Sequence, residues 1–423
     1  MFRPAIAAAL VLWAGAIFGQ QPPDETFSAT PDHPAIAYAT LPTSDAVRRL
    51  ARNIEAGSWR LDFKPPHGYL RSLLGALDIA ESSQVVSFSK TSLQAETISP
   101  ANPRAIYFND TTAVAFPGGG FIEIATQDPR QGFVFYVLEQ RAVARPQFLR
   151  PSACLTCHVA YATLNVPGAL VRSVATGAAG QTLPFVWNGT TSHRTPHAER
   201  WAGWYVTGRS GGVAHLGNTL MRSDAPDQNV RPAASALPAL PDRVASGRTV
   251  TAHSDIAALV VFDHQMHGMN LLARTGWDIR VAVADAPATA GAVAARVAAD
   301  LVDYLLFIDE APLAGPVRGD SGFAATFAAK GPKDRAGRSL RDLDLATRLL
   351  KYPCSYLVYS EAFDALPAMA KDAVYARLWH VLSGAERETP RYARLSRADR
   401  QAITEILRET KKDLPPYFRG RVG

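Results

Sequence analysis

The residues with the clearest capacity for chemistry lie in one short segment, Cys154-Leu155-Thr156-Cys157-His158. Two cysteines three positions apart on one helical turn can reach the two vinyl groups of a haem and form thioether bonds. The histidine that follows can supply an axial nitrogen to the iron. The C-x-x-C-H spacing therefore predicts one covalently bound haem c, attached at Cys154 and Cys157 and ligated by His158.

Two other interpretations of the cysteine pair stay open. A thioredoxin-like redox pair would follow a strand in a βαβ unit, whereas Pro151 and an irregular stretch precede the motif here. A structural zinc site would need a second pair of ligands, and the third cysteine, Cys354, is alone almost two hundred residues away. We expect Cys354 to be a buried, inert thiol without a disulfide partner.

The residue on the other side of the iron decides which chemistry is accessible. His193 and His215 lie in Gly/Pro-rich chain 35 and 57 residues beyond His158, and loops of that length can fold back over a haem. We predict His193 as the distal iron ligand, with His215 as the second candidate. His197, Met221 or an open site are the remaining alternatives.

Three arginines that follow the motif, Arg172, Arg194 and Arg200, are candidates to bind the haem propionates, because a guanidinium fork matches a carboxylate. With both axial positions filled, no substrate reaches the iron, and the expected function is one-electron transfer with redox proteins as partners. With an open distal site, the alternatives are a haem enzyme with peroxidase-like or small-nitrogen-compound chemistry, or a haem-based sensor.

The motif resembles that of c-type cytochromes, which implies haem attachment at Cys154 and Cys157 and iron ligation by His158. A compact cytochrome c carries its motif near the start of its domain, whereas more than a hundred residues precede it here. Over a wider span the chain is similar to secreted bacterial mono-haem proteins known as cytochrome c domain-containing, on the stretches ERWAGWYVTG at 199–208 and PCSY at 353–356. This resemblance implies haem and export, without an assigned activity.

The first twenty residues are typical of a secretory signal peptide. Arg3 precedes an apolar stretch at 5–18, and small residues follow it. The stretch is short for a membrane span, which needs about 20 apolar residues. We therefore expect a periplasmic or otherwise exported mature protein without an integral membrane span, with an uncleaved anchor as the alternative. Covalent haem attachment outside the cytoplasm agrees with this location.

The apolar patterns along the rest of the chain predict an α+β fold. After the signal peptide at 1–20, we expect three regions. Residues 21–145 form an N-terminal arm and a small antiparallel β region, 146–250 an irregular haem c-binding region, and 251–423 a helical region. Apolar runs punctuated by turn residues predict strands at 84–89, 105–108, 113–116, 121–126 and 133–138. Helical periodicity predicts helices at 46–56, 256–272, 288–308, 340–350, 360–383 and 397–410.

The composition of the chain limits the classes of protein and of function that are possible. The 423 residues are 47% hydrophobic, which is enough to bury a sizeable core. The 44 basic and 38 acidic residues give a formal charge of +6 without a run of five like charges, so nucleic-acid binding is not expected. Oligomeric state, redox potential and substrate are not indicated by the sequence.

Overall fold

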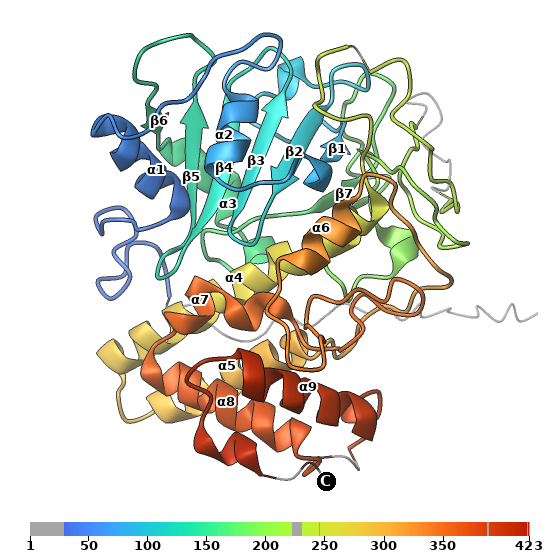
Figure 1. The fold of residues 1–423 in the computed structure, drawn as a ribbon. Helices are drawn as coiled ribbons and strands as arrows, with labels where there is room; N and C mark the ends of the chain where they lie inside the picture. The colour runs from blue at the N-terminus through green and yellow to red at the C-terminus, as the bar shows by residue number, and fades with distance from the viewer. Residues whose placement is uncertain (1–28, 222–230, 245, 387–388, 421, 423) are drawn as a thin grey trace, which may run out of the picture.

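The α+β class predicted from the sequence is confirmed (Figure 1). The computed structural model describes residues 29–221, 231–244, 246–386, 389–420 and 422. An antiparallel sheet occupies the N-terminal half, and helices dominate the C-terminal half. The predicted signal peptide lies outside the described residues.

The predicted strands form the centre of a seven-stranded antiparallel sheet with the order β6-β5-β4-β3-β2-β1-β9. Its middle is a meander in which short turns join successive strands, as the turn residues predicted. The last position in the sheet is taken by a strand that follows the C-x-x-C-H motif in sequence. The strands are β1 (Val85–Ser87), β2 (Arg104–Phe108), β3 (Thr112–Pro117), β4 (Ile122–Asp128), β5 (Gly132–Leu138), β6 (Phe148–Leu149) and β9 (Trp204–Tyr205). A separate pair consists of β7 (Arg172–Val174) and β8 (Asn188–Thr190).

Both faces of the sheet are covered, because side chains alternate between two apolar cores along each strand. Tyr107, Val114 and Ile124 belong to one core, which also holds α1 (Ala46–Glu55) and α2 (Leu70–Ala76). In Figure 1, α2 lies in front of the sheet and α1 at its left side. Residues of the opposite face, among them Ile106, Phe108 and Phe135, pack in the larger core. The strand meander thus has two buried faces instead of one buried and one solvated.

The larger core is organised by α4 (Ile256–Asp285), a helix of 30 residues with most of its side chains buried. Asp255 caps its start, accepting hydrogen bonds from the backbone N–H groups of Ala257 and Ala258. Figure 1 shows the C-terminal helices gathered below the sheet. These are α5 (Ala290–Leu305), α7 (Glu361–Asp364), α8 (Ala368–Leu382) and α9 (Arg397–Thr410), while α6 (Phe323–Ala329) lies nearer the sheet.

One predicted helix is wrong and another is interrupted. Residues 340–350 are not helical: the Asp344 side chain accepts hydrogen bonds from the N–H groups of Ala346 and Thr347, and Leu345 has a positive φ of 58°. Such a local side-chain turn competes with helix formation. The predicted helix at 360–383 is divided into α7, which ends at Asp364, and α8, which begins directly after Pro367. The helix at 397–410 is confirmed, with the predicted capping box between Ser396 and Asp399.

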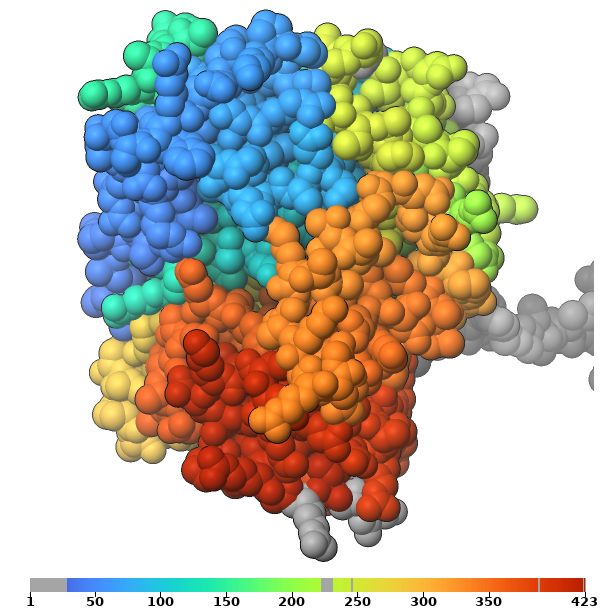
Figure 2. All heavy atoms as spheres, viewed as in Figure 1, coloured from blue at the N-terminus to red at the C-terminus, as the bar shows by residue number. Residues whose placement is uncertain are grey.

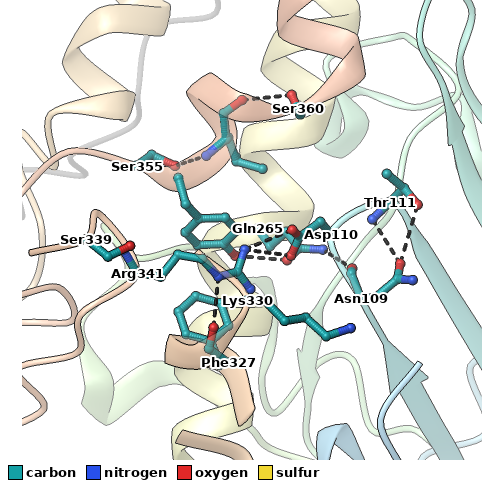
Figure 3. A network of polar contacts seen from close by, with 12 residues as sticks. Asn109, Asp110, Thr111, Gln265, Phe327, Lys330, Ser339, Arg341, Ser355 and Ser360 are labelled. Atoms are coloured by element: carbon teal, nitrogen blue, oxygen red, sulfur yellow. Dashed lines mark hydrogen bonds and ion pairs between the residues drawn. The ribbon is translucent and has the colours of Figure 1, made fainter. Parts of the chain in front are cut away.

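A group of polar contacts links the C-terminal helical region to the turn between β2 and β3 (Figure 3). Arg341 donates two hydrogen bonds to the carboxylate of Asp110, at 2.9 and 2.8 Å, and its guanidinium lies over the rings of Phe327 and Tyr356. The Tyr356 hydroxyl in turn donates to Gln265 on α4 at 2.8 Å. This ion pair, in which Nη1 of Arg341 contacts both carboxylate oxygens of Asp110, therefore joins segments far apart in sequence.

The three predicted regions share one core. The larger apolar cluster runs from Val85 to Phe418 and draws on all of them. In Figure 2 the orange segment around 310–350 lies across the boundary between the blue N-terminal part and the red C-terminal part. None of the helices within the described residues is both long and apolar enough to span a membrane.

Candidate haem-attachment site

The segment Cys154–His158, called the attachment turn below, forms a 3-10 turn followed by the four-residue helix α3 (Leu155–His158). It comes directly after β6, so the edge of the sheet fixes where it begins. Cys154 and Leu155 are partly buried and pack against the larger core, whereas Cys157 is exposed. Both thiols are free. Cys157 therefore faces solvent at the turn, while Cys154 and Leu155 hold the turn against the core.

His158 is oriented by the loop that follows it. Its Nδ1 lies 2.7 Å from the carbonyl oxygen of Gly168, and the Gly168 N–H donates back to the His158 carbonyl at 2.9 Å. A carbonyl can only accept, so Nδ1 carries the proton and Nε2 holds the lone pair. Nε2 makes no hydrogen bond to any residue that the structure describes. Burial lowers the pKa of His158, which keeps the imidazole neutral at pH 7.

The sheet face beside the attachment turn carries one flat ring and several small side chains. The ring of Phe135 lies 4.4 Å from that of His158, measured between centroids. Ala125 is directly opposite Phe135 in the sheet, and Ala113 is opposite Ala125. Ala115, which is paired with Glu123, is half-buried like Ala125. Beside the Phe135 ring, β3 and β4 therefore offer apolar surface with small side chains.

A charged pair lies on the same face. The Arg104 guanidinium is 3.5 Å from the Glu123 carboxylate, with side chains 14% and 19% exposed. After burial, the Glu123 carboxylate is the largest cause that raises the pKa of Cys154. Behind burial and the Gly168 hydrogen bond, Arg104 lowers and Glu123 raises the pKa of His158. Both charges therefore act electrostatically on the attachment turn.

His193, predicted as the distal ligand, is enclosed elsewhere. It is 2% exposed, its Nδ1 is 2.7 Å from Nδ1 of His264, and its ring stacks on Tyr304 and Phe307 at 4.1 and 4.6 Å. We call these four residues the histidine cluster. Burial is the main cause that lowers the pKa of His193 and that of His264, the latter to about 3. His193 Nε2 has no hydrogen-bond partner among the described residues.

His215 is fully buried as well. Its Nδ1 accepts a hydrogen bond from the Gly217 N–H at 3.0 Å, and its ring meets Trp201 edge-on at 5.1 Å. Across the described ranges, no hydrogen bond or ring contact of His193 or His215 reaches the attachment turn. The prediction that one of them ligates iron stays a prediction.

Of the other sequence candidates, the arginines are already engaged. Arg172 donates to Asn188 at 2.6 Å, and Arg194 lies over the ring of Tyr304. Arg200 is buried against Asp263, 3.3 Å away. Cys354 is a buried free thiol, as predicted, and burial raises its pKa to about 12.

The surroundings of the cysteine pair differ in how well they suit zinc, a thioredoxin-like redox pair and haem c. No group of three or more His, Cys, Asp or Glu side chains within the described part of the chain could hold a metal ion, so the cysteine pair lacks the further ligands that a zinc site needs. The turn follows a two-residue edge strand of an antiparallel sheet, which is not the βαβ setting of a thioredoxin-like pair. Two free thiols on one turn, an imidazole whose Nε2 makes no hydrogen bond within the described part of the chain, and an apolar sheet face match the requirements of haem c.

Four residues of this site were not found from the sequence: Arg104, Glu123, Phe135 and Gly168. The strand pattern contained a signal for three of them. Arg104, Glu123 and Phe135 lie on, or next to, predicted strands at positions that alternate onto one face. Which face meets the attachment turn is set by tertiary packing. No protein-family model, curated protein or solved structure matches this chain.

Proposed function

We propose that this chain binds one haem c through thioether bonds to Cys154 and Cys157, ligates its iron with His158, and carries single electrons. The observation that carries the proposal is the hydrogen bond from His158 Nδ1 to the Gly168 carbonyl. A metal-ligating histidine typically donates its other ring N–H to a carbonyl or carboxylate, which fixes the ring and leaves Nε2 for the metal. Here that arrangement lies beside two free thiols on one turn.

The chain's own residues have distinct roles in this proposal. Haem c, when bound, supplies one-electron exchange at its iron. Leu155 anchors the attachment turn in the core, and Gly168 holds the His158 ring. Phe135 and the half-buried alanines of β3 and β4 provide apolar cover. An exported, periplasmic location and redox proteins as partners belong to the same proposal.

Covalent attachment is tested first. The full chain, produced together with a haem-attachment system, is expected to keep haem-dependent peroxidase staining on a denaturing gel. Cys154→Ala combined with Cys157→Ala is expected to lose the stain. Cys354→Ala is the matched control, because it removes a cysteine that is buried away from solvent, and it is expected to keep the stain. A wild-type chain without covalent haem would overturn the proposal.

A second candidate function is ligand chemistry at an open iron site, as in a haem enzyme or a haem-based sensor. It is favoured by the position of His193 and His215, whose rings make their contacts away from the attachment turn. An absorption spectrum with and without carbon monoxide separates the candidates. A low-spin spectrum that carbon monoxide leaves unchanged supports the electron carrier. A high-spin spectrum with immediate carbon monoxide binding makes the second candidate the better one.

A further inference from the structure

Arg104 is placed on the face of the sheet that meets the attachment turn. Glu123 is two residues from Ala125 on β4, about 7 Å along the strand and on the same face. Ala125 is opposite Phe135, whose ring contacts His158. Arg104 shares this face, since it is two residues before Ile106, a member of the core on that side. Its ion pair with Glu123 confirms that the two side chains meet.

The guanidinium of Arg104 is incompletely bonded. Nη1 is 3.4 Å from the Thr91 carbonyl oxygen and 3.5 Å from Glu123, which is longer than the usual range of about 2.7 to 3.2 Å. Its Nε is buried and has no hydrogen-bond partner among the described residues. A guanidinium has five N–H donors in a fixed fork. Arg104 therefore keeps donor capacity for one more acceptor.

Glu123 does not depend on Arg104 for its hydrogen bonds. Its Oε1 accepts from the Ser92 hydroxyl at 2.6 Å and from the Gln94 amide at 3.1 Å. If Arg104 turned toward another anion, the Glu123 carboxylate would still hold these two donors. The pair is thus asymmetric, with a satisfied acid and an arginine that has spare donors.

We propose that Arg104 binds an oxyanion, of the carboxylate class, next to the attachment turn. The proposal deepens the function proposed above and rests on it. The carboxylate comes either from a propionate of the bound haem or from a free small anion. Arg172 and Arg200 have closer partners than Arg104. Arg194 also has a guanidinium nitrogen, Nη2, without a hydrogen-bond partner among the described residues, but its contacts are with Ile308 and Tyr304. Arg104 therefore differs from the three arginines predicted from the sequence in combining spare donors with a place on the sheet face beside the attachment turn.

The test measures the midpoint potential of the haem-loaded full chain from pH 5 to 9, with and without formate as the probe. Arg104→Gln removes a positive charge near the iron, so the potential is expected to fall, whereas Glu123→Gln is expected to raise it. If the haem propionate is the ligand, formate has no effect on the wild type, and Arg104→Gln alters the pH dependence. If a free anion is the ligand, formate shifts the wild-type potential saturably, and Arg104→Gln weakens formate binding at least tenfold.

Two further variants keep the test decisive. Arg48→Gln removes an arginine of α1, which packs on the opposite face of the sheet, and it is expected to leave potential and formate response unchanged. Arg104→Lys keeps the charge and loses the fork, so it is expected to alter the pH dependence or the formate affinity even if Arg104→Gln does not fold. Haem-loaded Arg104 variants that match the wild type in all three measurements overturn the inference. Absence of covalent haem overturns the proposed function instead.

Discussion

The attachment turn and the histidine cluster contain the same kind of side chain in opposite surroundings. His158 has one ring nitrogen fixed by a carbonyl and the other without a hydrogen bond, beside a sheet face of small side chains. His193 stacks on two aromatic rings in the interior and is hydrogen-bonded to a second histidine, His264. The packing around an imidazole, more than its place in the sequence, therefore decides whether its nitrogen is available to a ligand.

Charges differ between the two regions in the same way. The histidine cluster adjoins Asp263 and Arg200, whose side chains are 0% and 1% exposed. Near the attachment turn the charged pair, Arg104 and Glu123, keeps contact with solvent. Buried charges stabilise a fold only while every partner is present, whereas partly exposed charges can exchange partners. We therefore expect substitutions to act on stability in the first region and on ligand chemistry in the second.

The largest effect is expected from Asp263→Ala. The Asp263 carboxylate accepts hydrogen bonds from Thr191, Trp201 and Arg200, at 2.7, 3.0 and 3.3 Å. Its removal leaves the buried guanidinium of Arg200 without its carboxylate partner, which lowers the free energy of unfolding by about 3 to 5 kcal/mol. Urea unfolding measures the change. The control Glu55→Ala, which breaks an exposed pair on α1, is expected to cost about 1 kcal/mol or less. Equal losses in the two variants would contradict the contrast.

An intermediate effect is expected from the pH dependence of Glu310. Burial raises the pKa of Glu310 to about 7, from an ordinary value of 4.5. The folded chain therefore keeps a proton on Glu310 that the unfolded chain releases. The contribution of this proton to the free energy of unfolding is complete below pH 4.5 and is lost as the pH rises through 7. The loss amounts to about 3 kcal/mol. Subtracting the unfolding free energies of Glu310→Gln from those of the wild type, from pH 4 to 8, should give this curve.

A matched control for Glu310 is Glu139→Gln, which removes an exposed carboxyl group of the same size. It is expected to leave the slope of stability against pH close to that of the wild type. A difference curve for Glu310→Gln that is flat, or that rises with pH, would show that the Glu310 carboxyl group does not stay protonated in the folded chain.

The smallest effect on stability is expected from His158→Ala. In the haem-free chain it removes one hydrogen bond at a partly exposed position, which costs about 1 kcal/mol. In the haem-loaded chain we expect the haem to stay attached through its thioethers while the absorption spectrum changes, since the iron loses a nitrogen ligand. Unfolding curves and spectra check both parts. An unchanged spectrum would remove His158 from the iron and weaken the comparison with His193.

The strands of the meander could be predicted because their apolar runs end at residues that favour turns. Asn109 and Asp110 end one run, and residues 117–120 end the next. The strands β6 and β9 contain two residues each, too few for an alternating pattern to be visible. The helix predicted at 340–350 failed for a local reason, since the Asp344 side chain bonds the backbone that a helix would need.

In the candidate site, too, the residues that form a local sequence pattern could be predicted, and those brought in by tertiary packing could not. Cys154, Cys157 and His158 form a local pattern whose chemistry depends on spacing, so the sequence was sufficient to propose it. Gly168, Phe135 and Arg104 reach the attachment turn from other elements, and only the folded chain places them there. The predicted distal ligand depended on a long irregular segment folding back over the motif. In the folded chain that segment carries His193 to α4 and α5, and iron ligation by His193 stays a prediction.

The sheet has an unusual pair of borders. It ends on both sides in strands of only two residues, β6 and β9. Unpaired N–H and C=O groups on a long outer strand invite another chain to add a strand, which leads to aggregation. Two short border strands leave little backbone for such an addition. A second protein that approaches the sheet must therefore recognise side chains and surface shape, since the ladder of backbone hydrogen bonds is almost closed to it.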